Sequence, residues 1–339
     1  MRMARLKADP QSPTAFYHCI SRVVDRRFIF GDVERDHFVT LMRLYEAFCG
    51  VHVLTYAVMS NHFHILVEAP RRPDVMPSQE VLLKRIEALH SPLYADNVRS
   101  LLHSMTEADA QKHLQGYWKR MYDVSWFIRL IKQRFSQWYN GRKRRCGTLW
   151  EQRFKSVLVE GSGDVLATIA AYIDLNPVRV GLVADPKDYR WCGYAEAIAG
   201  GALAQNGIRL VMKGLERRKW EGVLEGYRLW LFGQAHEVRG HGGISPADVE
   251  RVVREKGGLP LWEYLLCSVR YFVDGAVIGR RGYVEEIFAS QRWRFGRRRK
   301  TGARPLRGLD GIELFSLSNL RSRVLKCPRG AQRIQPSVS

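Results

Sequence analysis

Two histidines stand two residues apart in a segment whose apolar pattern is typical of a β-strand. His62 and His64 alternate with Phe63, Ile65 and Val67 in the run NHFHILVE. Because side chains alternate between the faces of a strand, both imidazoles leave one face and the apolar residues leave the other. Neutral imidazole is among the commonest metal donors, so the pair could share one divalent ion. The pattern is short, however, and two ordinary histidines on the open face of an antiparallel sheet would give the same letters.

A second pair, Tyr172 and Asn176, lies in the segment ATIAAYIDLNPVRVGLV. Residues four apart are neighbours on one face of a helix, and Pro177 follows at the predicted helix end. A tyrosine hydroxyl held in line with a phosphodiester can attack it when a metal ion offsets the phosphate charge. An amide oxygen one turn away could complete the ligand set of that ion. Taken alone, the spacing favours a core tyrosine, because the chain has 14 of them.

The elements that must position these side chains follow a simple order at the start of the chain. Residues 14–24 are predicted to form a strand, residues 32–50 an amphipathic helix that stops at Gly50, and residues 51–70 two strands broken at Ser60 and Asn61. Strand, helix, strand, strand within 70 residues indicates an α+β fold.

The later segments are predicted from their periodicity and composition. Residues 71–125 are expected to be an insertion or long connecting segment, followed by a basic amphipathic helix from Ser125 and a strand within 148–160. Asp164 is predicted to cap the helix that carries Tyr172. We expect a first domain over residues 1–200, a mainly helical C-terminal extension over 207–290, and a basic, loosely ordered tail over 291–339.

The overall charge indicates a polyanionic partner. The chain has 339 residues, with 54 Lys and Arg against 34 Asp and Glu, a formal net charge of +20. Such an excess attracts nucleic acid through counterion release from phosphates. We expect no membrane partner, because the sequence has no run of 18 apolar residues and no signal-peptide core, and we expect a cytoplasmic, nucleoid-associated protein. The six cysteines form no CxxC pair, which argues against a zinc knuckle or a disulfide framework.

Four motifs in order resemble the REP-associated tyrosine transposases, a branch of the single-tyrosine HUH transposases of the insertion-sequence group. They are YHCISRVVDRRFIF, VLTYAVMSNHFHILVE, GTLWEQRFKSVLVE and YIDLNPVRVGLV, within residues 12–195. The resemblance implies a ferredoxin-like α+β domain with a central antiparallel sheet. It also implies that His62 and His64 are metal ligands, that Asn176 supplies a third ligand, and that Tyr172 is the nucleophile.

The chemistry implied by this resemblance is cleavage and rejoining of single-stranded DNA at hairpin elements. Tyr172 would form a 5′-phosphotyrosine link and release a 3′-OH, with Mg²⁺ or Mn²⁺ as the cofactor. No nucleotide cofactor is expected, because the intermediate keeps the phosphodiester energy and the sequence has no Walker-type phosphate loop. The resemblance favours a monomer over a homodimer, with the tyrosine helix acting in the chain that carries it.

Basic and aromatic residues predict where DNA binds. Between Arg129 and Lys155 the sequence has nine basic residues and one acid, Glu151, with Trp138, Tyr139, Trp150 and Phe154 among them. Cations for phosphates together with aromatic rings for unstacked bases suit single-stranded DNA. The residues predicted to contact DNA are Arg22, Arg142, Lys143, Arg144, Arg145, Arg153 and Arg179.

Three other functions fit parts of the pattern. A catalytically inert hairpin-binding protein derived from a transposase would need neither the histidines nor Tyr172. A phosphodiesterase that uses water would need carboxylates near the histidines, and only Glu68 lies on their strand face. A relaxase or replication initiator usually has a third histidine in the cluster, and the sequence shows none beside His62 and His64.

Overall fold

The computed structural model describes residues 6–215, 217–232, 261–309, 313–318, 320 and 325–326. The central strand, β1 (Thr14–Arg22), pairs antiparallel with two other strands, β3 (His62–Pro70) and β4 (Lys155–Val159). A further antiparallel strand, β2 (His52–Val58), borders β3. This core of four strands confirms the prediction of an α+β fold with a central antiparallel sheet.

The sheet continues beyond β4 with strands from the far end of the chain. The order within the described residues is β2-β3-β1-β4-β6-β8-β7. The added strands are β6 (Val277–Gly279), which runs parallel to β4, and then β8 (Phe315–Ser316) and β7 (Arg304–Pro305). The sequence predicts no strand in residues 207–290 and a loosely ordered tail after residue 290. The pairing of β6, β8 and β7 with the sheet therefore differs from the prediction.

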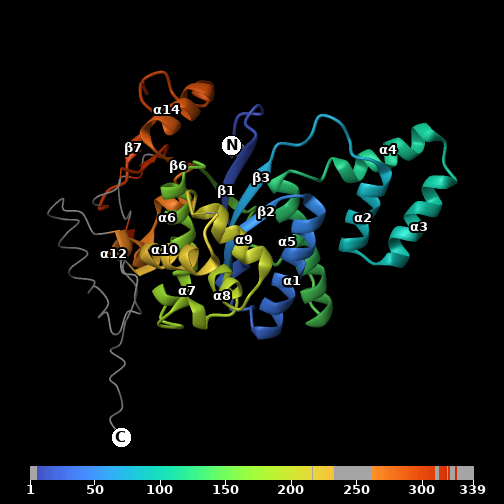
Figure 1. The fold of residues 1–339 in the computed structure, drawn as a ribbon, viewed down its shortest axis with the longest axis horizontal. Coiled ribbons are helices and arrows are strands. Elements are labelled where there is room, and N and C mark those ends of the chain that lie inside the picture. Colours follow the sequence, from blue (N-terminus) through green and yellow to red (C-terminus); the bar gives the residue numbers. More distant parts are fainter. Residues whose placement is uncertain are drawn as a thin grey trace, which may run out of the picture.

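Helices cover both faces of the sheet (Figure 1). One face carries α1 (Asp32–Cys49) and α5 (Val124–Arg142), with Phe38, Phe63 and Phe135 in a shared apolar core. Local signals fix both helices. Asp123 accepts hydrogen bonds from the first backbone N–H groups of α5, and Gly50 ends α1 at a φ of 64°.

The opposite face carries the predicted catalytic helix. This is α6 (Gly163–Asp174), and the short α7 (Asn176–Arg179) follows it after Leu175. Ser162, and not Asp164, is the residue before the first turn of α6. Pro177 lies in the first turn of α7 and does not end the helical path, because a proline N-terminal in a helix removes no hydrogen bond that the helix needs.

The remaining helices of this face come from residues 186–232. They are η2 (Pro186–Asp188), α8 (Gly193–Ile198), α9 (Ala202–Val211) and α10 (Trp220–Phe232). Their apolar side chains join Tyr172 and strand residues in one core, which also includes Phe272 and Ile278. The described residues on either side of position 200 therefore share a core.

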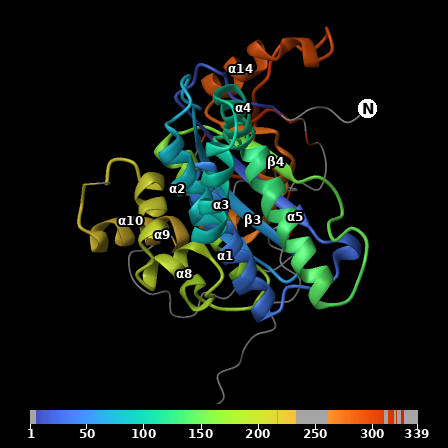
Figure 2. The same cartoon turned by 90° about the vertical axis from the view of Figure 1, so that its right-hand side faces the viewer.

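The predicted insertion contains three helices. They are α2 (Gln79–Leu89), α3 (Pro92–His103) and α4 (Glu107–Trp118). They project beside α1 at one end of the molecule, and Figure 2 views this end directly. The side chain of Arg72 fastens the segment, since its Nη2 donates to the carbonyl of Met121 at 2.8 Å.

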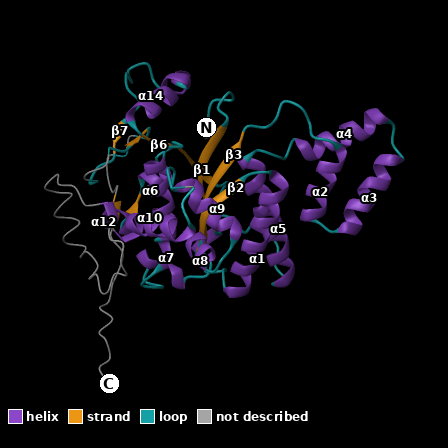
Figure 3. Cartoon of the chain, in the orientation of Figure 1, coloured by secondary structure: helices purple, strands orange, loops and turns teal. Residues whose placement is uncertain are grey.

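Short elements complete the C-terminal part (Figure 3). They are α12 (Leu261–Leu266), β5 (Ser268–Val269), α13 (Tyr271–Asp274), α14 (Arg281–Ser290), η3 (Arg292–Arg294) and β9 (Leu325–Lys326). Near the start of the chain, the short helix η1 (Val24–Arg26) follows β1. Part of the predicted basic tail is folded, because Arg299 donates to the carbonyl oxygens of Gly302 and Leu317. None of the helices in the described ranges has the length and apolar content needed to cross a bilayer.

Candidate active site

Three histidines meet on one face of the sheet. In the register of β1 with β3, Ile20 is opposite His64 and His18 is opposite Leu66, so His18 and His64 are diagonal neighbours on the same face. Their rings stack with centroids 5.1 Å apart, and the rings of His62 and His64 are also 5.1 Å apart. The expectation that the cluster lacks a third histidine is therefore wrong. His18 lies 46 residues from His64 in the sequence, so local spacing gives no sign of this contact, although the strand motif YHCISR contains His18.

Hydrogen bonds fix which nitrogen of His64 carries its proton. His18 Nδ1 lies 2.8 Å from the carbonyl oxygen of Phe272, and His18 Nε2 lies 2.9 Å from His64 Nδ1. A carbonyl oxygen only accepts, so His18 donates from Nδ1, and a neutral His18 then accepts at Nε2 from the N–H of His64. The lone pair of His64 is consequently on Nε2.

A similar contact orients His62. Its Nδ1 lies 2.7 Å from Oδ1 of Asn61, an oxygen that only accepts. A neutral His62 therefore also has its lone pair on Nε2. Asn61 is itself held in place, because its Nδ2 donates to the carbonyl of Arg26.

The environment keeps all three imidazoles neutral. Burial, together with the charge of Arg179, lowers the pKa of His18 to about 3, although the hydrogen bond to Phe272 acts in the opposite direction. Burial, with the charges of Arg22 and Arg179, lowers the pKa of His62 to about 3 and that of His64 well below its ordinary value. Neutral imidazoles are the form that binds a metal ion.

Tyr172 lies against this cluster from the helical side. The centroid of its ring is 6.2 Å from that of His18 and 6.3 Å from that of His64. The ring also packs edge-on against Phe272 of α13, with centroids 4.8 Å apart. Only 2% of Tyr172 is exposed. The fold thus brings the predicted nucleophile and the histidine pair together, with Tyr172 and His64 buried and His62 partly exposed.

Arg179 locks the backbone around Tyr172. Its guanidinium carbon lies 4.1 Å from the centroid of the Tyr172 ring, and Nη2 donates to the carbonyls of Tyr172 and Leu265 at 3.0 and 2.7 Å. Arg179 is buried, so it lies inside the protein and not on the surface where a DNA contact was predicted. No described carboxylate pairs with it, and its Nε is buried without a partner.

Asn176 is one turn from Tyr172, as the spacing predicts, but its amide is engaged. Oδ1 accepts a hydrogen bond of 2.7 Å from Arg179, and Nδ2 donates to the carbonyl of Ile173 at 3.0 Å. The oxygen that was expected to be a third metal ligand is therefore bonded to a cation in this conformation.

The donors available for a metal ion are the two Nε2 lone pairs of His62 and His64. In the part of the chain that the structure describes, no group of three His, Cys, Asp or Glu side chains is arranged to hold a metal. Glu68 is at the other end of β3, where it accepts from Thr14 and bonds to His52. The pair fits a divalent ion that takes its remaining ligands from water and from phosphate oxygens of a substrate.

The residues predicted to contact DNA fall into two groups besides Arg179. Arg142, Lys143, Arg144 and Arg153 are exposed at or after the end of α5, and Arg145 is half-buried there. Arg22 stands opposite His62 in the β1–β3 register, and its guanidinium has no hydrogen bond or salt bridge to any described residue. Among the aromatic residues, Trp150 fills the core and donates to Ser136 Oγ at 2.8 Å, whereas Trp138 and Tyr139 are half-buried.

A comparison with known families finds a match for the part of the chain that contains the histidine pair. Residues 12–81 match the IS200-like transposase family. This IS200-like segment runs from β1 through β3 into the start of α2, and it includes His18, His62 and His64 but neither Tyr172 nor Asn176.

One similar solved structure is described as a REP-associated tyrosine transposase bound to a REP hairpin. It is 14% identical, the alignment covers 59% of this chain and 87% of that one, and the TM-score is 0.37. No curated protein matches the chain.

Proposed function

We propose that this protein cleaves and rejoins single-stranded DNA at hairpin elements through a covalent link to Tyr172. The observation that carries the proposal is the position of the Tyr172 ring, within 6.3 Å of the rings of both His18 and His64. The family match of residues 12–81 supports a transposase of the IS200-like kind. The net charge of +20 supports a nucleic-acid substrate.

The site has the electrostatic character that a phosphodiester requires. Arg22 and Arg179 lie close enough to the histidines to lower their pKa values, and Arg179 has no described carboxylate partner. A buried cation without a counter-charge is costly, so an entering phosphate would be stabilised by offsetting it.

In the proposed reaction, the histidine pair and Tyr172 have separate roles. His62 and His64 would hold a divalent ion through Nε2, and when bound this ion offsets the charge on the scissile phosphate. The Tyr172 oxygen attacks phosphorus, the bond from phosphorus to the 3′ oxygen breaks, and the products are a 5′-phosphotyrosine and a 3′-OH. The phenol loses one proton and the leaving 3′ oxygen gains one, so the step needs no other reactant. Attack by a 3′-OH reverses it and joins strands.

Burial of Tyr172 is the observation that favours the other candidate function, an inert hairpin-binding protein. A ring that is 2% exposed must become accessible before it can attack DNA, and the Asn176 oxygen must leave Arg179 before it can bind a metal. An inert binder would never need either movement.

A covalent-adduct assay distinguishes the two functions. Purified protein is incubated with a labelled single-stranded hairpin library and Mn²⁺ or Mg²⁺, and denaturing gels show any DNA that migrates with protein. We expect an adduct with the wild-type protein and with Tyr94→Phe, a control at a partly exposed tyrosine, and none with Tyr172→Phe. Binding without any adduct would support the inert binder, and cleavage by Tyr172→Phe would identify water as the nucleophile.

The proposed active unit is a monomer. The Tyr172 helix reaches the histidines of its own chain, which supports action in cis. Size-exclusion chromatography at several concentrations tests this proposal, and a stable dimer would contradict it.

A further inference from the structure

A pocket is lined by residues of the loop that follows β1 and by residues at and after the end of α5. It has a volume of about 630 Å³, in the range of small-molecule sites. Val23, Val24, Ile29 and Leu149 give it an apolar lining, and Arg27, Lys143, Arg145 and Tyr139 add charge and an aromatic ring. We call these residues, together with Phe28 at the rim, the loop pocket.

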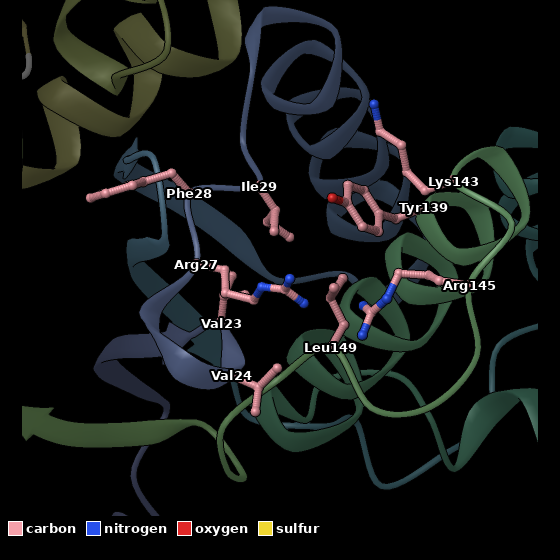
Figure 4. A pocket seen from close by; sticks show the side chains of 9 residues that line it. All are labelled: Val23, Val24, Arg27, Phe28, Ile29, Tyr139, Lys143, Arg145 and Leu149. Atoms are coloured by element: carbon pink, nitrogen blue, oxygen red, sulfur yellow. The ribbon is translucent and has the colours of Figure 1, made fainter.

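Two guanidinium groups face each other across the loop pocket. Figure 4 shows Arg27 and Arg145 pointing toward one another from opposite loops, with Leu149 between them and the Tyr139 ring alongside. Neither arginine has a salt bridge to a described carboxylate. Lys143, in contrast, is 3.3 Å from Glu34, which compensates its charge. Like charges that line one pocket without a counter-ion repel each other, so an anion between the two guanidinium groups would be stabilised.

The rest of the pocket suits a flat, partly apolar group. Tyr139 is half-buried, and Arg145 lies 6.0 Å from its ring centroid, so one face of the ring has a cation nearby. Ile29 and Val24 are partly exposed and supply apolar surface beside it, above the buried side chains of Val23 and Leu149. An anion next to an aromatic and apolar surface is the combination that binds a phosphate with an unstacked base.

Hydrogen bonds connect the loop pocket to the histidine cluster. The amide of Val23 donates to the carbonyl of Asn61, and Asn61 Nδ2 donates to the carbonyl of Arg26. The same Asn61 side chain accepts from His62. On the other side, the amide of Val24 donates to the carbonyl of Leu149. The pocket walls are therefore tied to the residue that orients a predicted metal ligand.

We propose that the loop pocket binds one unpaired nucleotide of the DNA substrate, with its phosphate between Arg27 and Arg145 and its base against Tyr139. This inference rests on the proposed function for its substrate class. It adds Arg27 to the residues predicted to contact DNA, and it gives Arg27, Arg145 and Tyr139 the role of holding single-stranded DNA next to the His62 side of the active site.

The test measures binding in EDTA, so that no chemistry takes part. A stem-loop selected from a random library by binding to the wild-type protein is synthesised blunt and with a short single-stranded extension at either end. Fluorescence anisotropy then gives the affinity of each form. We expect one extension to raise the affinity of the wild-type protein about tenfold, the contribution typical of one stacked base.

Variants locate the effect. Arg27→Gln and Arg145→Gln should abolish the gain from the extension, and should lower the salt dependence of binding by about 0.7 per lost phosphate contact. Lys84→Gln, an exposed charge on α2, is the matched control and should keep the gain. Because Arg27 is exposed, its replacement should leave the fold intact, which circular dichroism checks.

A spectroscopic readout tests the base contact. With 2-aminopurine in the extension, stacking quenches fluorescence on binding. The quenching should persist in Tyr139→Phe, which keeps a ring, and should be lost in Tyr139→Leu.

The proposal is overturned if Arg27→Gln weakens binding of the blunt and extended hairpins equally, or if it weakens binding of neither hairpin. It is also overturned if no extension changes the affinity of the wild-type protein. An extension-dependent gain without any Tyr172 adduct would refute the proposed function and leave the pocket assignment standing. A Tyr172 adduct without that gain would support the proposed function and refute the pocket assignment.

Discussion

The imidazole of His18 stands between a backbone carbonyl and a predicted metal ligand, and this position gives it a defined task. It accepts the N–H of His64 and so directs the lone pair of His64 toward Nε2. Asn61 does the same for His62. Residues that hold ligand imidazoles in one tautomer commonly contribute 10- to 100-fold to metal affinity.

Replacement of His18 should therefore weaken metal binding before any DNA is present. In His18→Leu, His64 Nδ1 loses its acceptor, and we expect Mn²⁺ affinity to fall by about 10- to 100-fold. His18→Gln places an amide oxygen near the position of Nε2 and should restore much of the loss. Calorimetric titration with Mn²⁺ measures the affinity, and ¹⁵N NMR of the histidine side chains reports the tautomer. Wild-type affinity in His18→Leu would show that His18 is only a core residue.

At the scale of elements, the orientation of α6 depends on one buried carboxyl group. Asp174 accepts from Thr55 of β2 at 2.7 Å, from Tyr227 of α10 at 2.6 Å and from the amide of Tyr194 in α8 at 3.3 Å. It lies two residues after Tyr172, so the same contacts fix Tyr172 relative to the sheet. Burial raises the pKa of Asp174 to about 7, although its three donors act in the opposite direction.

Loss of this group should destabilise the protein and misplace Tyr172. Asp174→Ala leaves buried donors without acceptors, at a cost of about 3 kcal/mol of unfolding free energy. Asp174→Asn keeps one acceptor oxygen and should cost less, and Tyr227→Phe, which removes a single donor, should cost about 1 kcal/mol. Urea denaturation followed by circular dichroism gives these values. Equal stability of Asp174→Ala and the wild-type protein would mean that apolar packing alone positions α6.

The whole molecule couples its stability to pH through the buried histidines. The pKa values of His18 and His62 are lowered from 6.5 to about 3, and that of His64 lies well below its ordinary value. Below pH 6.5 the unfolded chain binds protons at these positions and the folded protein does not. The stability that the neutral histidines contribute is therefore fully present above pH 6.5 and is lost as the pH drops toward 3. Asp174 has the opposite effect, because its raised pKa lets the folded state hold a proton that the unfolded state releases.

Three histidines outweigh one aspartate, so the metal-free protein should lose stability on acidification. We expect the unfolding free energy to fall by about 2–3 kcal/mol between pH 6 and pH 5. Urea denaturation in EDTA at several pH values measures this slope. His62→Asn should reduce it by about 1 kcal/mol per pH unit. A flat profile over this interval would show that the histidines are hydrated and titrate normally.

The sequence by itself determined the features that depend on local periodicity. Alternation in NHFHILVE predicted that His62 and His64 share a face, and the helical spacing of Tyr172 and Asn176 predicted neighbours one turn apart; both follow from backbone geometry that a few residues fix. The order of strand, helix, strand, strand, with the insertion after it, was visible for the same reason.

Tertiary structure alone decided which distant side chains meet. The contact of His18 with His64 depends on the β1–β3 register, and the burial of Arg179 depends on Leu265 and on helices that pack from later in the chain. The bond from Arg179 to Asn176 and the loop pocket, which joins residues 23–29 to residues 139–149, have the same origin. The strand β6 beside β4 left no periodic signal in its three residues. Local pattern states which way a side chain faces, but its partners follow from packing between segments far apart in sequence, and only the folded chain fixes that packing.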